Sequence, residues 1–236
     1  GCAGGSGTGC GAGGSGPWPS GRGLGNPIQP GAGAKLFHET DFTDGSGALD
    51  FARSYNSFGF QPPTHVPNPS AIPPILNDVW RTPYDSRLVN VGGTVYAYAM
   101  VRPDNTVKYF TTAGVEYPHL PGRPVESLTA LGGGAYLFTG EDDHTETYDS
   151  SGRLTQLWDK KNLTRTLAYD ASNRVVSVTD ARGRVLSFAY TPGSGLLARS
   201  VVMTAPDGGS YTYTFDFLGR LTSVGYPDST TRQYLY

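Results

Sequence analysis

An aromatic residue, followed by aspartate in three of its five copies, returns at a fixed interval in the last part of the chain. Tyr148, Tyr169 and Tyr190 stand 21 residues apart, and after an insertion of four residues Phe215 and Tyr236 stand 21 apart again. Three of these positions open the sequences YDSSGRL, YDASNRV and FDFLGRL. A repeat of this length is one supersecondary unit that buries its apolar face only by stacking on its neighbours. The period therefore favours a stacked, architectural fold over a single catalytic centre.

Each period also contains reverse turns of one form, an aspartate followed three positions later by glycine or asparagine. Aspartate at the first position of a type I turn accepts a backbone hydrogen bond, and glycine or asparagine tolerates the left-handed fourth position. Most of these turns begin 10 or 11 residues apart, which leaves a normal strand length between them. The pattern predicts an all-β fold, a continuous antiparallel meander of hairpins that forms a curled sheet or part of a β-shell. Its turn residues are Asp149, Gly152, Asp159, Asn162, Asp170, Asn173, Asp180, Gly183, Asp216 and Gly219.

The predicted strands alternate between large and small side chains. Leu167 and Tyr169 correspond, one period on, to Phe188 and Tyr190, whereas Ala168 between them is small. Alternation with a period of two indicates a sheet with two unlike faces. We expect the repeat aromatics to form a ladder along the bulky face. They are Tyr148, Tyr169, Tyr190, Phe215 and Tyr236.

An arginine follows three of the turns directly. Arg153, Arg174 and Arg220 each come after the glycine or asparagine that closes the turn. We expect each guanidinium to pair with an aspartate or a backbone carbonyl of a neighbouring strand. Binding of an anionic ligand is the alternative.

The tract resembles the YD repeats of Rhs proteins, the large shell-forming proteins of bacterial polymorphic toxins and insecticidal toxin complexes. Residues 25–28 (GNPI), 39–42 (ETDF) and 49–57 (LDFARSYNS) resemble, in the same order, the module that precedes the repeats in many Rhs proteins. The resemblance covers residues 25–236. It implies a sheet that spirals into a hollow shell around a toxin, in a secreted or cell-surface bacterial protein. Carbohydrate binding has also been suggested for such repeats.

The chain divides into three parts. Residues 1–24 form a Gly-rich extended arm or linker, and 25–140 an Rhs N-terminal β module with a Pro-rich loop at 61–83. Residues 141–236 hold the YD repeats, which we expect to continue beyond the chain end. We therefore expect a processed chain or a piece of a longer one.

Composition narrows the classes of partner. The formal net charge is −2 and the basic residues are scattered through turns, so no electrostatic footprint for nucleic acid is present. No apolar run reaches the roughly 20 residues that a membrane helix needs. The two cysteines, Cys2 and Cys10, fit no metal or redox spacing, and their distance leaves a disulfide and free thiols both open.

Residues that often carry chemistry do not converge in this sequence. The four histidines sit in unrelated segments, and the one acidic cluster with a histidine, Glu141 to His144, reads as a solvated hairpin turn. No nucleophile elbow, phosphate-binding loop or zinc pattern is present. We therefore expect no catalytic residue, no cofactor and no metal.

The leading hypothesis is a non-enzymatic structural scaffold or shell segment. It encloses a C-terminal toxin in a longer parent, or assembles into an extracellular fibre through the two unpaired edges of an open meander. Its partners are then other copies, the rest of a longer Rhs chain, or a toxin domain. The alternative is a carbohydrate-binding surface module, in which exposed tyrosines and Trp158 stack on the sugar rings of a glycan.

Overall fold

The computed structural model describes a chain built from strands alone. The described residues are 28–29, 34–57, 72–77, 79–104, 106–118, 125–159, 161, 163–193 and 197–236. They form strands β1 to β19 and no helix, which confirms the all-β prediction. This described part accordingly contains no apolar helix of the length needed to span a bilayer. The arm at 1–24 with Cys2 and Cys10, the turn residue Asn162 and most of the loop at 61–83 lie outside it.

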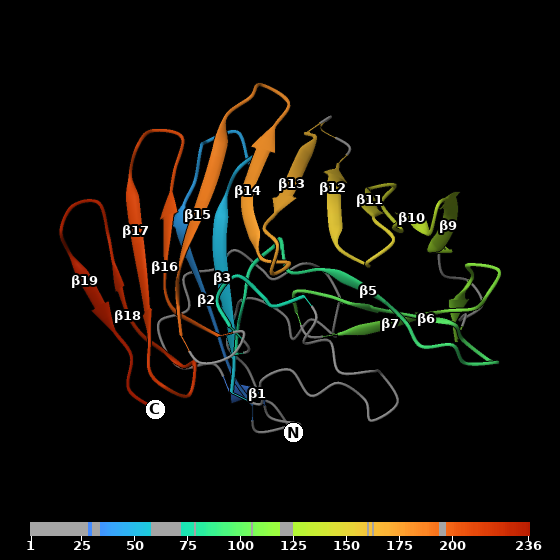
Figure 1. The fold of residues 1–236 in the computed structure, drawn as a ribbon, viewed down its shortest axis with the longest axis horizontal. Helices are drawn as coiled ribbons and strands as arrows, with labels where there is room; N and C mark the ends of the chain where they lie inside the picture. Colours follow the sequence, from blue (N-terminus) through green and yellow to red (C-terminus); the bar gives the residue numbers. More distant parts are fainter. Residues whose placement is uncertain are drawn as a thin grey trace, which may run out of the picture.

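The largest sheet has 11 strands, and each pairs antiparallel with the strand before it. It curves across the molecule without closing into a barrel, as Figure 1 shows. Its strands are β9 (Ser127–Gly132), β10 (Ala135–Thr139), β11 (Thr145–Tyr148), β12 (Leu154–Trp158), β13 (Arg165–Tyr169), β14 (Val175–Asp180), β15 (Val185–Pro192), β16 (Ala198–Thr204), β17 (Ser210–Phe215), β18 (Leu221–Gly225) and β19 (Thr231–Gln233). We call it the repeat sheet; it confirms the predicted meander. It begins at Ser127, inside the range 25–140 assigned from the sequence to the module.

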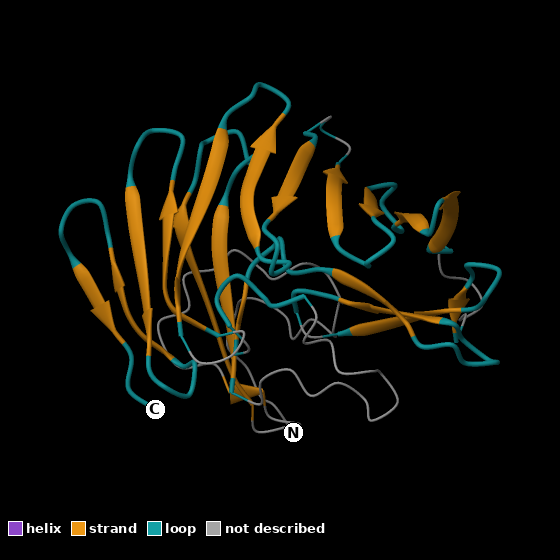
Figure 2. Ribbon diagram, viewed as in Figure 1, coloured by secondary structure: helices purple, strands orange, loops and turns teal. Residues whose placement is uncertain are grey.

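Two smaller antiparallel sheets precede the repeat sheet in the chain, and we call them the module sheets. The first consists of β1 (Ile28–Gln29), β2 (Ala34–Phe42), β3 (Phe51–Asn56) and β4 (Trp80–Arg81). The second consists of β5 (Arg87–Asn90), β6 (Tyr98–Val101), β7 (Val107–Phe110) and β8 (Glu116–Tyr117). Figure 2 shows the strands β2 and β3 beside the C-terminal half of the repeat sheet, and β5 to β7 beside its N-terminal half.

The core lies between the repeat sheet and the module sheets. Phe51 of β3 packs against Phe188 of β15 and Tyr213 of β17, with ring centroids 5.6 and 5.9 Å apart. At the other half, Phe110 of β7 packs edge-on against Phe138 of β10 at 6.0 Å. All five rings are buried. The bulky face of the repeats is thus the covered face, because burying these rings removes apolar surface from water.

The predicted alternation is visible along the strands of the repeat sheet. Leu167, Leu186 and Phe188 face the core, whereas Thr166 and Ser187 at alternate positions are exposed. A one-residue shift in register falls at three of the repeat aromatics, where Tyr148 pairs with Leu154, Tyr169 with Val175 and Phe215 with Leu221. Such a bulge adds one residue on one strand and increases the local twist. Tyr190 differs, since the shift in its strand falls between Thr191 and Pro192.

The two edges of the repeat sheet differ. At the β9 edge, the Leu128 amide donates to the Gly114 carbonyl at 2.8 Å, and Val115 bridges Ser127. This edge is therefore joined in part to the second module sheet, which corrects the expectation of two unpaired edges. The β19 edge ends the strand order of the sheet.

Candidate functional site: the junction between module and repeats

The aspartate turns share one hydrogen-bond pattern. Each aspartate Oδ1 accepts the amides two and four positions on, at 2.8–3.0 and 2.9–3.1 Å. These aspartates are Asp149, Asp159, Asp170, Asp180 and Asp216. The fourth residue has positive φ at Gly152 (79°), Asn173 (60°), Gly183 (78°) and Gly219 (78°). Each carboxylate thus closes its own turn.

The arginine that follows each turn binds the aspartate of its own turn. Arg153 Nε and Nη2 both lie 2.7 Å from Asp149 Oδ2, and Arg174 makes the same pair of contacts with Asp170. The expected aspartate partner is present, but it belongs to the arginine's own turn and not to a neighbouring strand. Arg153 Nη1 also donates to Asn173 Oδ1, in the equivalent turn one repeat on, at 3.1 Å. Both nitrogens bind Oδ2, because Oδ1 accepts the two backbone amides of the turn.

Each of these guanidiniums also covers the aromatic ring that opens the next repeat. Arg153 lies over Tyr169 at 5.0 Å, and Arg174 over Tyr190 at 4.8 Å. The Arg220–Tyr236 pair repeats the arrangement at 5.2 Å. Aspartate, arginine and aromatic therefore recur with spacings of 4 and 16 residues, and cation–π contacts link successive repeats.

The repeat aromatics occupy different depths in the sheet. Tyr148 and Phe215 are buried, Tyr169 and Tyr190 are half-buried, and Tyr236 is 51% exposed. The hydroxyls of Tyr169 and Tyr190 donate to the carbonyls of Leu154 and Val175 at 2.8 and 2.7 Å. Burial raises the pKa of both phenols, so they stay protonated and act as donors. In place of the expected stacking of tyrosine on tyrosine, an arginine side chain covers the rings of Tyr169, Tyr190 and Tyr236.

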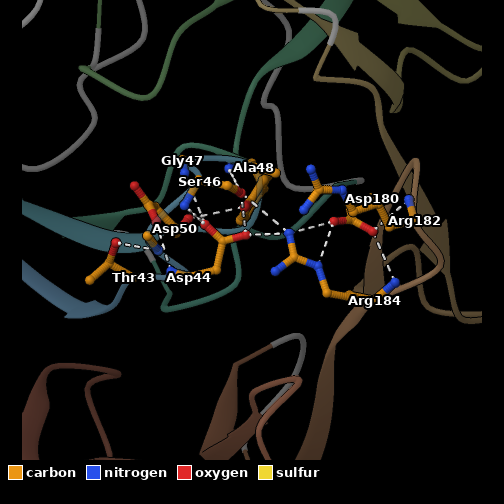
Figure 3. A network of polar contacts seen from close by, with 11 residues as sticks. Thr43, Asp44, Ser46, Gly47, Ala48, Asp50, Asp180, Arg182 and Arg184 are labelled. Carbon is orange, nitrogen blue, oxygen red and sulfur yellow. Dashed lines mark hydrogen bonds and ion pairs between the residues drawn. The ribbon is translucent and has the colours of Figure 1, made fainter.

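One turn arginine leaves this pattern and reaches the module. Arg184 binds Asp180 of its own turn, and its Nη2 also lies 2.5 Å from Asp44 Oδ2 (Figure 3). Asp44 belongs to the loop between β2 and β3, where its Oδ1 accepts the amides of Ser46 and Gly47 at 2.9 Å. Both carboxylates are only 3% exposed. A single cation thus joins the two parts of the chain, and we call this contact the Asp44 clasp.

The hydrogen-bond and ion-pair partners of Asp44 favour its ionised form. Burial alone would raise the pKa of Asp44, but hydrogen bonds from Ser46 and Gly47 and the charge of Arg184 outweigh it and hold the pKa at about 2. Hydrogen bonds to the ionised form favour that form. The clasp is therefore an ion pair throughout the neutral and mildly acidic range.

A second contact centres on a fully buried arginine. Arg53 of β3 donates from Nε to Asp41 Oδ2 at 2.7 Å and forms an ion pair with Glu39. Its guanidinium lies 4.7 Å from the Trp80 ring and 5.2 Å from the Tyr234 ring. Although burial acts to lower the pKa of Arg53, the hydrogen bond and charge of Asp41 raise it overall. The cation is retained because two carboxylates and two aromatic faces compensate its desolvation.

Tyrosines of the last repeats complete this buried cluster. The hydroxyls of Tyr213 and Tyr226 donate to Asp41 at 2.8 and 3.3 Å, and Tyr234 donates to Glu39. Burial, followed by the charge of Asp41, raises the pKa of Tyr213 well above its usual value. We call Arg53, Asp41, Glu39 and these tyrosines the Arg53 cluster. It joins β2 and β3 to β17 and the strands that follow.

The third contact comes from the segment between β3 and β4 of the first module sheet. Asn77, buried with φ of 62°, donates from Nδ2 to the carbonyls of Ala198 and Gly219 at 3.4 and 3.3 Å. It therefore binds two adjacent turns of the repeat sheet. At another turn, between β11 and β12, the Leu88 amide donates to the Gly152 carbonyl at 2.9 Å. A Cβ added at Gly152 would lie 1.9 Å from the Leu88 carbonyl oxygen, so this approach requires glycine.

The acidic cluster with a histidine lies beside a further ion pair between module and repeats. Asp142 and His144 sit in the β10–β11 turn, where they contact each other, and His144 Nε2 lies 3.8 Å from the buried Glu146. Glu146 also pairs with Arg102 of the module at 2.5 Å. No three acidic, histidine or cysteine side chains of the described chain gather closely enough to hold a metal. The arrangement favours mechanical joining of two layers over chemistry on a substrate.

Sequence reasoning missed the residues that join the two layers. Arg184 follows its turn as Arg153 and Arg174 do, and Asp44 opens a loop of the same Asp-x-x-Gly form. Arg184 and Asp44 differ from the equivalent residues of the other turns only in the residues that surround them in the folded chain. A signal was present at Arg53 and Asp41, which lie within the module segments that resemble Rhs proteins. The spacing of Arg53 and Asp41 in the sequence does not by itself predict that they pair.

Comparison with known protein families agrees with this two-part organisation. The family described as RHS Repeat matches residues 148–185 and 169–199. The family described as Domain of unknown function (DUF6531) matches residues 25–110. No curated protein matches the chain. The repeat match lies within the repeat sheet, and the second match spans the first module sheet and most of the second.

Proposed function

We propose, on the premise that this chain is an Rhs-type YD-repeat protein, that its repeat sheet is a wall segment of a structural β-shell. The module sheets brace one face of that wall. The observation that carries the proposal is the set of long-range contacts between them, the Asp44 clasp, the Arg53 cluster and Asn77. Each contact involves buried or nearly buried polar groups, which are costly unless partnered and so fix one arrangement of the layers.

The opposite face of the wall supports a role in enclosure. Its side chains are largely small and uncharged over six successive strands, β13 to β18. They include Thr166, Ala168, Ser177, Ser187, Ala189, Val202, Thr212, Thr214 and Ser223. A polypeptide can lie along such a surface without forming fixed ion pairs. In this proposal a longer parent chain, secreted or held at the cell surface, encloses a C-terminal toxin against walls of this kind.

The geometry favours the shell over the two other hypotheses. Fibre growth through sheet edges needs two open edges, and the β9 edge is bonded to the module at Leu128. Glycan stacking along the repeats needs open aromatic faces, but Tyr148 is buried and arginines cover Tyr169, Tyr190 and Tyr236. The proposed protein is therefore a non-catalytic scaffold, and a glycan array is expected to show no binding.

The proposal is tested by electron microscopy of the native protein that contains this sequence. The expected result is a closed hollow particle with this segment in its wall. Filaments that extend by edge pairing, or a compact particle with no lumen, would contradict it. A matched sample carrying Arg53→Met and Arg184→Gln is expected to give open or broken particles, because the Arg53 cluster and the Asp44 clasp both lose their cation.

A further inference from the structure

Two turns of the repeat sheet share the backbone of the aspartate turns but lack their aspartate and arginine at the equivalent positions. In the turn between β16 and β17, the Ala205 amide donates to the Gly209 carbonyl at 2.8 Å. In the turn between β18 and β19, the Tyr226 amide donates to the Thr230 carbonyl at 2.9 Å. The aspartate and the arginine of the other turns form this same bond. Neither turn therefore supplies a guanidinium, because glycine and threonine stand at the arginine position.

Each of these two turns instead presents an exposed carboxylate at its third position. Asp207 Oδ1 accepts the Gly209 amide at 2.8 Å. Asp228 Oδ1 accepts the amide and the hydroxyl of Thr230 at 2.9 and 2.6 Å. Among the described residues, no lysine or arginine pairs with either aspartate, and nothing bonds to either Oδ2. The two turns therefore carry negative charge that this part of the chain does not neutralise.

The two turns border a shallow groove together with the strand β2. It has a volume of about 450 Å³ and is lined by Asp41, Tyr211, Tyr226, Pro227, Asp228 and Thr230. A Cβ built on Gly209 would lie 3.0 Å from Asp207 Oδ1 and 3.2 Å from Pro227 Cγ, so Asp207 stands beside the same groove. Every lining residue precedes β19, and the groove thus lies between two turns that the chain contains in full. We call it the turn groove.

A nearly buried phenol lines the turn groove without a hydrogen-bond partner. Tyr211 is only 9% exposed, yet its hydroxyl bonds to none of the described residues. Its ring packs edge-on against that of Tyr226 at 6.1 Å. Burial, followed by the charges of Asp207, Asp41 and Asp228, raises the pKa of Tyr211. The neutral hydroxyl therefore sits in a negative potential, and a buried polar group of this kind is costly until a ligand binds it.

The chemistry of the turn groove matches a planar organic cation. An arginine guanidinium carries one positive charge and five N–H donors, so it can reach two carboxylates and a phenol oxygen together. Its flat face also packs on tyrosine rings. The repeat sheet already uses this combination, since Arg153 binds Asp149 and covers the ring of Tyr169.

We propose that the turn groove binds the arginine side chain of a separate polypeptide, with its guanidinium between Asp207 and Asp228 and against the hydroxyl of Tyr211. The incoming arginine takes the place that the chain's own arginines hold at the other turns. The inference goes beyond the shell proposal, because it assigns a ligand to the turns at one end of the wall, and the wall does not depend on it.

NMR titration of the chain with the peptide acetyl-Gly-Arg-Gly-amide tests this. The resonances of Gly209, Tyr211 and Thr230 should shift and saturate. The same peptide with citrulline keeps the shape of arginine without its charge, and should bind at least about tenfold more weakly. The lysine peptide should also bind more weakly, because its compact ammonium lacks the planar fork of donors. Shifts that do not saturate, or equal binding of the arginine peptide and either control peptide, would overturn the proposal.

A pair of matched aspartates separates the turn groove from general attraction to acidic turns. Asp104, in the β6–β7 turn, accepts the amide and the hydroxyl of Thr106 at 2.9 and 2.7 Å, as Asp228 does from Thr230. Asp228→Asn should weaken arginine binding about tenfold, whereas Asp104→Asn should leave it unchanged. Equal effects of the two substitutions would contradict a specific site.

The hydroxyl of Tyr211 gives a second test, in which binding and stability respond differently. Tyr211→Phe should weaken arginine binding severalfold without lowering the melting temperature, because the lost hydroxyl has no partner in the described chain. Tyr213→Phe should lower the melting temperature, because its hydroxyl donates to Asp41 at 2.8 Å. A destabilised Tyr211→Phe variant would count against the proposal. Binding that appears only after Arg22→Gln or Arg123→Gln would assign the turn groove to an arginine of the same chain and overturn it.

Discussion

At the scale of single residues, the buried charge of Arg53 has the largest expected effect on stability. Arg53→Met leaves Asp41 and Glu39 beside an apolar side chain, with Asp41 1% and Glu39 9% exposed. Removing one partner of a buried ion pair typically costs about 3–5 kcal/mol, because the remaining charge is uncompensated. Urea unfolding should show a loss of that size in the free energy of unfolding.

Arg232 provides the matched control, since it pairs with the same Glu39 from a side chain that is 50% exposed. Exposed pairs contribute at most about 1 kcal/mol, so Arg232→Met should cost far less than Arg53→Met. Equal losses in the two variants would show that burial does not set the strength of the Arg53 cluster.

The Asp44 clasp predicts a dependence of stability on pH. The pKa of Asp44 is lowered from 3.8 to about 2 in the folded chain. A carboxyl with a lowered pKa stabilises the fold above its unfolded pKa, and that stabilisation is lost as the pH falls toward the folded value. Relative to Asp44→Asn, the parent chain should therefore lose about 2 kcal/mol of unfolding free energy between pH 5 and pH 2. A difference between the two proteins that stays constant over this range would rule out the lowered pKa.

At the scale of elements, two turns each contain a glycine with the same backbone conformation, but the two glycines have different neighbours. Gly152 and Gly183 have φ of 79° and 78°. A Cβ at Gly183 meets nothing within 4 Å, whereas at Gly152 it would lie 1.9 Å from the Leu88 carbonyl oxygen. Gly183→Ala should therefore cost only the strain of a left-handed alanine, on the order of 1–3 kcal/mol.

Gly152→Ala should cost clearly more, because the strand β5 must also move away from the turn. Thermal unfolding of both variants gives the comparison, and hydrogen exchange at the Leu88 amide should increase only in Gly152→Ala. If the two alanine variants melt together, the contact between β5 and this turn does not stabilise the fold.

At the scale of the whole molecule, a contact could be predicted from the sequence when its two residues lie close together along the chain. The meander was predictable because each aspartate turn closes within five residues, as at Asp149 and Gly152. The packing of the module was not, because Arg184 and Asp44 are 140 residues apart and Asn77 and Gly219 are 142 apart. Neither residue of such a pair lies in a local sequence pattern that identifies its distant partner. Long-range pairs of this kind decide which face of the sheet is covered.

These long-range pairs also predict that module and repeats unfold together. Phe51 is fully buried between Tyr84 of the module and Phe188 and Tyr213 of the repeats. Phe51→Ala should cost about 3–5 kcal/mol, because it leaves a cavity shared by both layers. Hydrogen exchange should then accelerate in β15 to β17 as well as in β2 and β3.

The exposed Phe217 is the matched control for this comparison, since Phe217→Ala removes a ring that is 84% exposed. Phe217→Ala should change the free energy of unfolding by no more than about 0.5 kcal/mol. If Phe51→Ala accelerated exchange in β2 and β3 alone, the repeat sheet would be stable without its module. The braced wall would then be two independent domains, and the contacts at Arg53, Arg184 and Asn77 would position the module without stabilising the sheet.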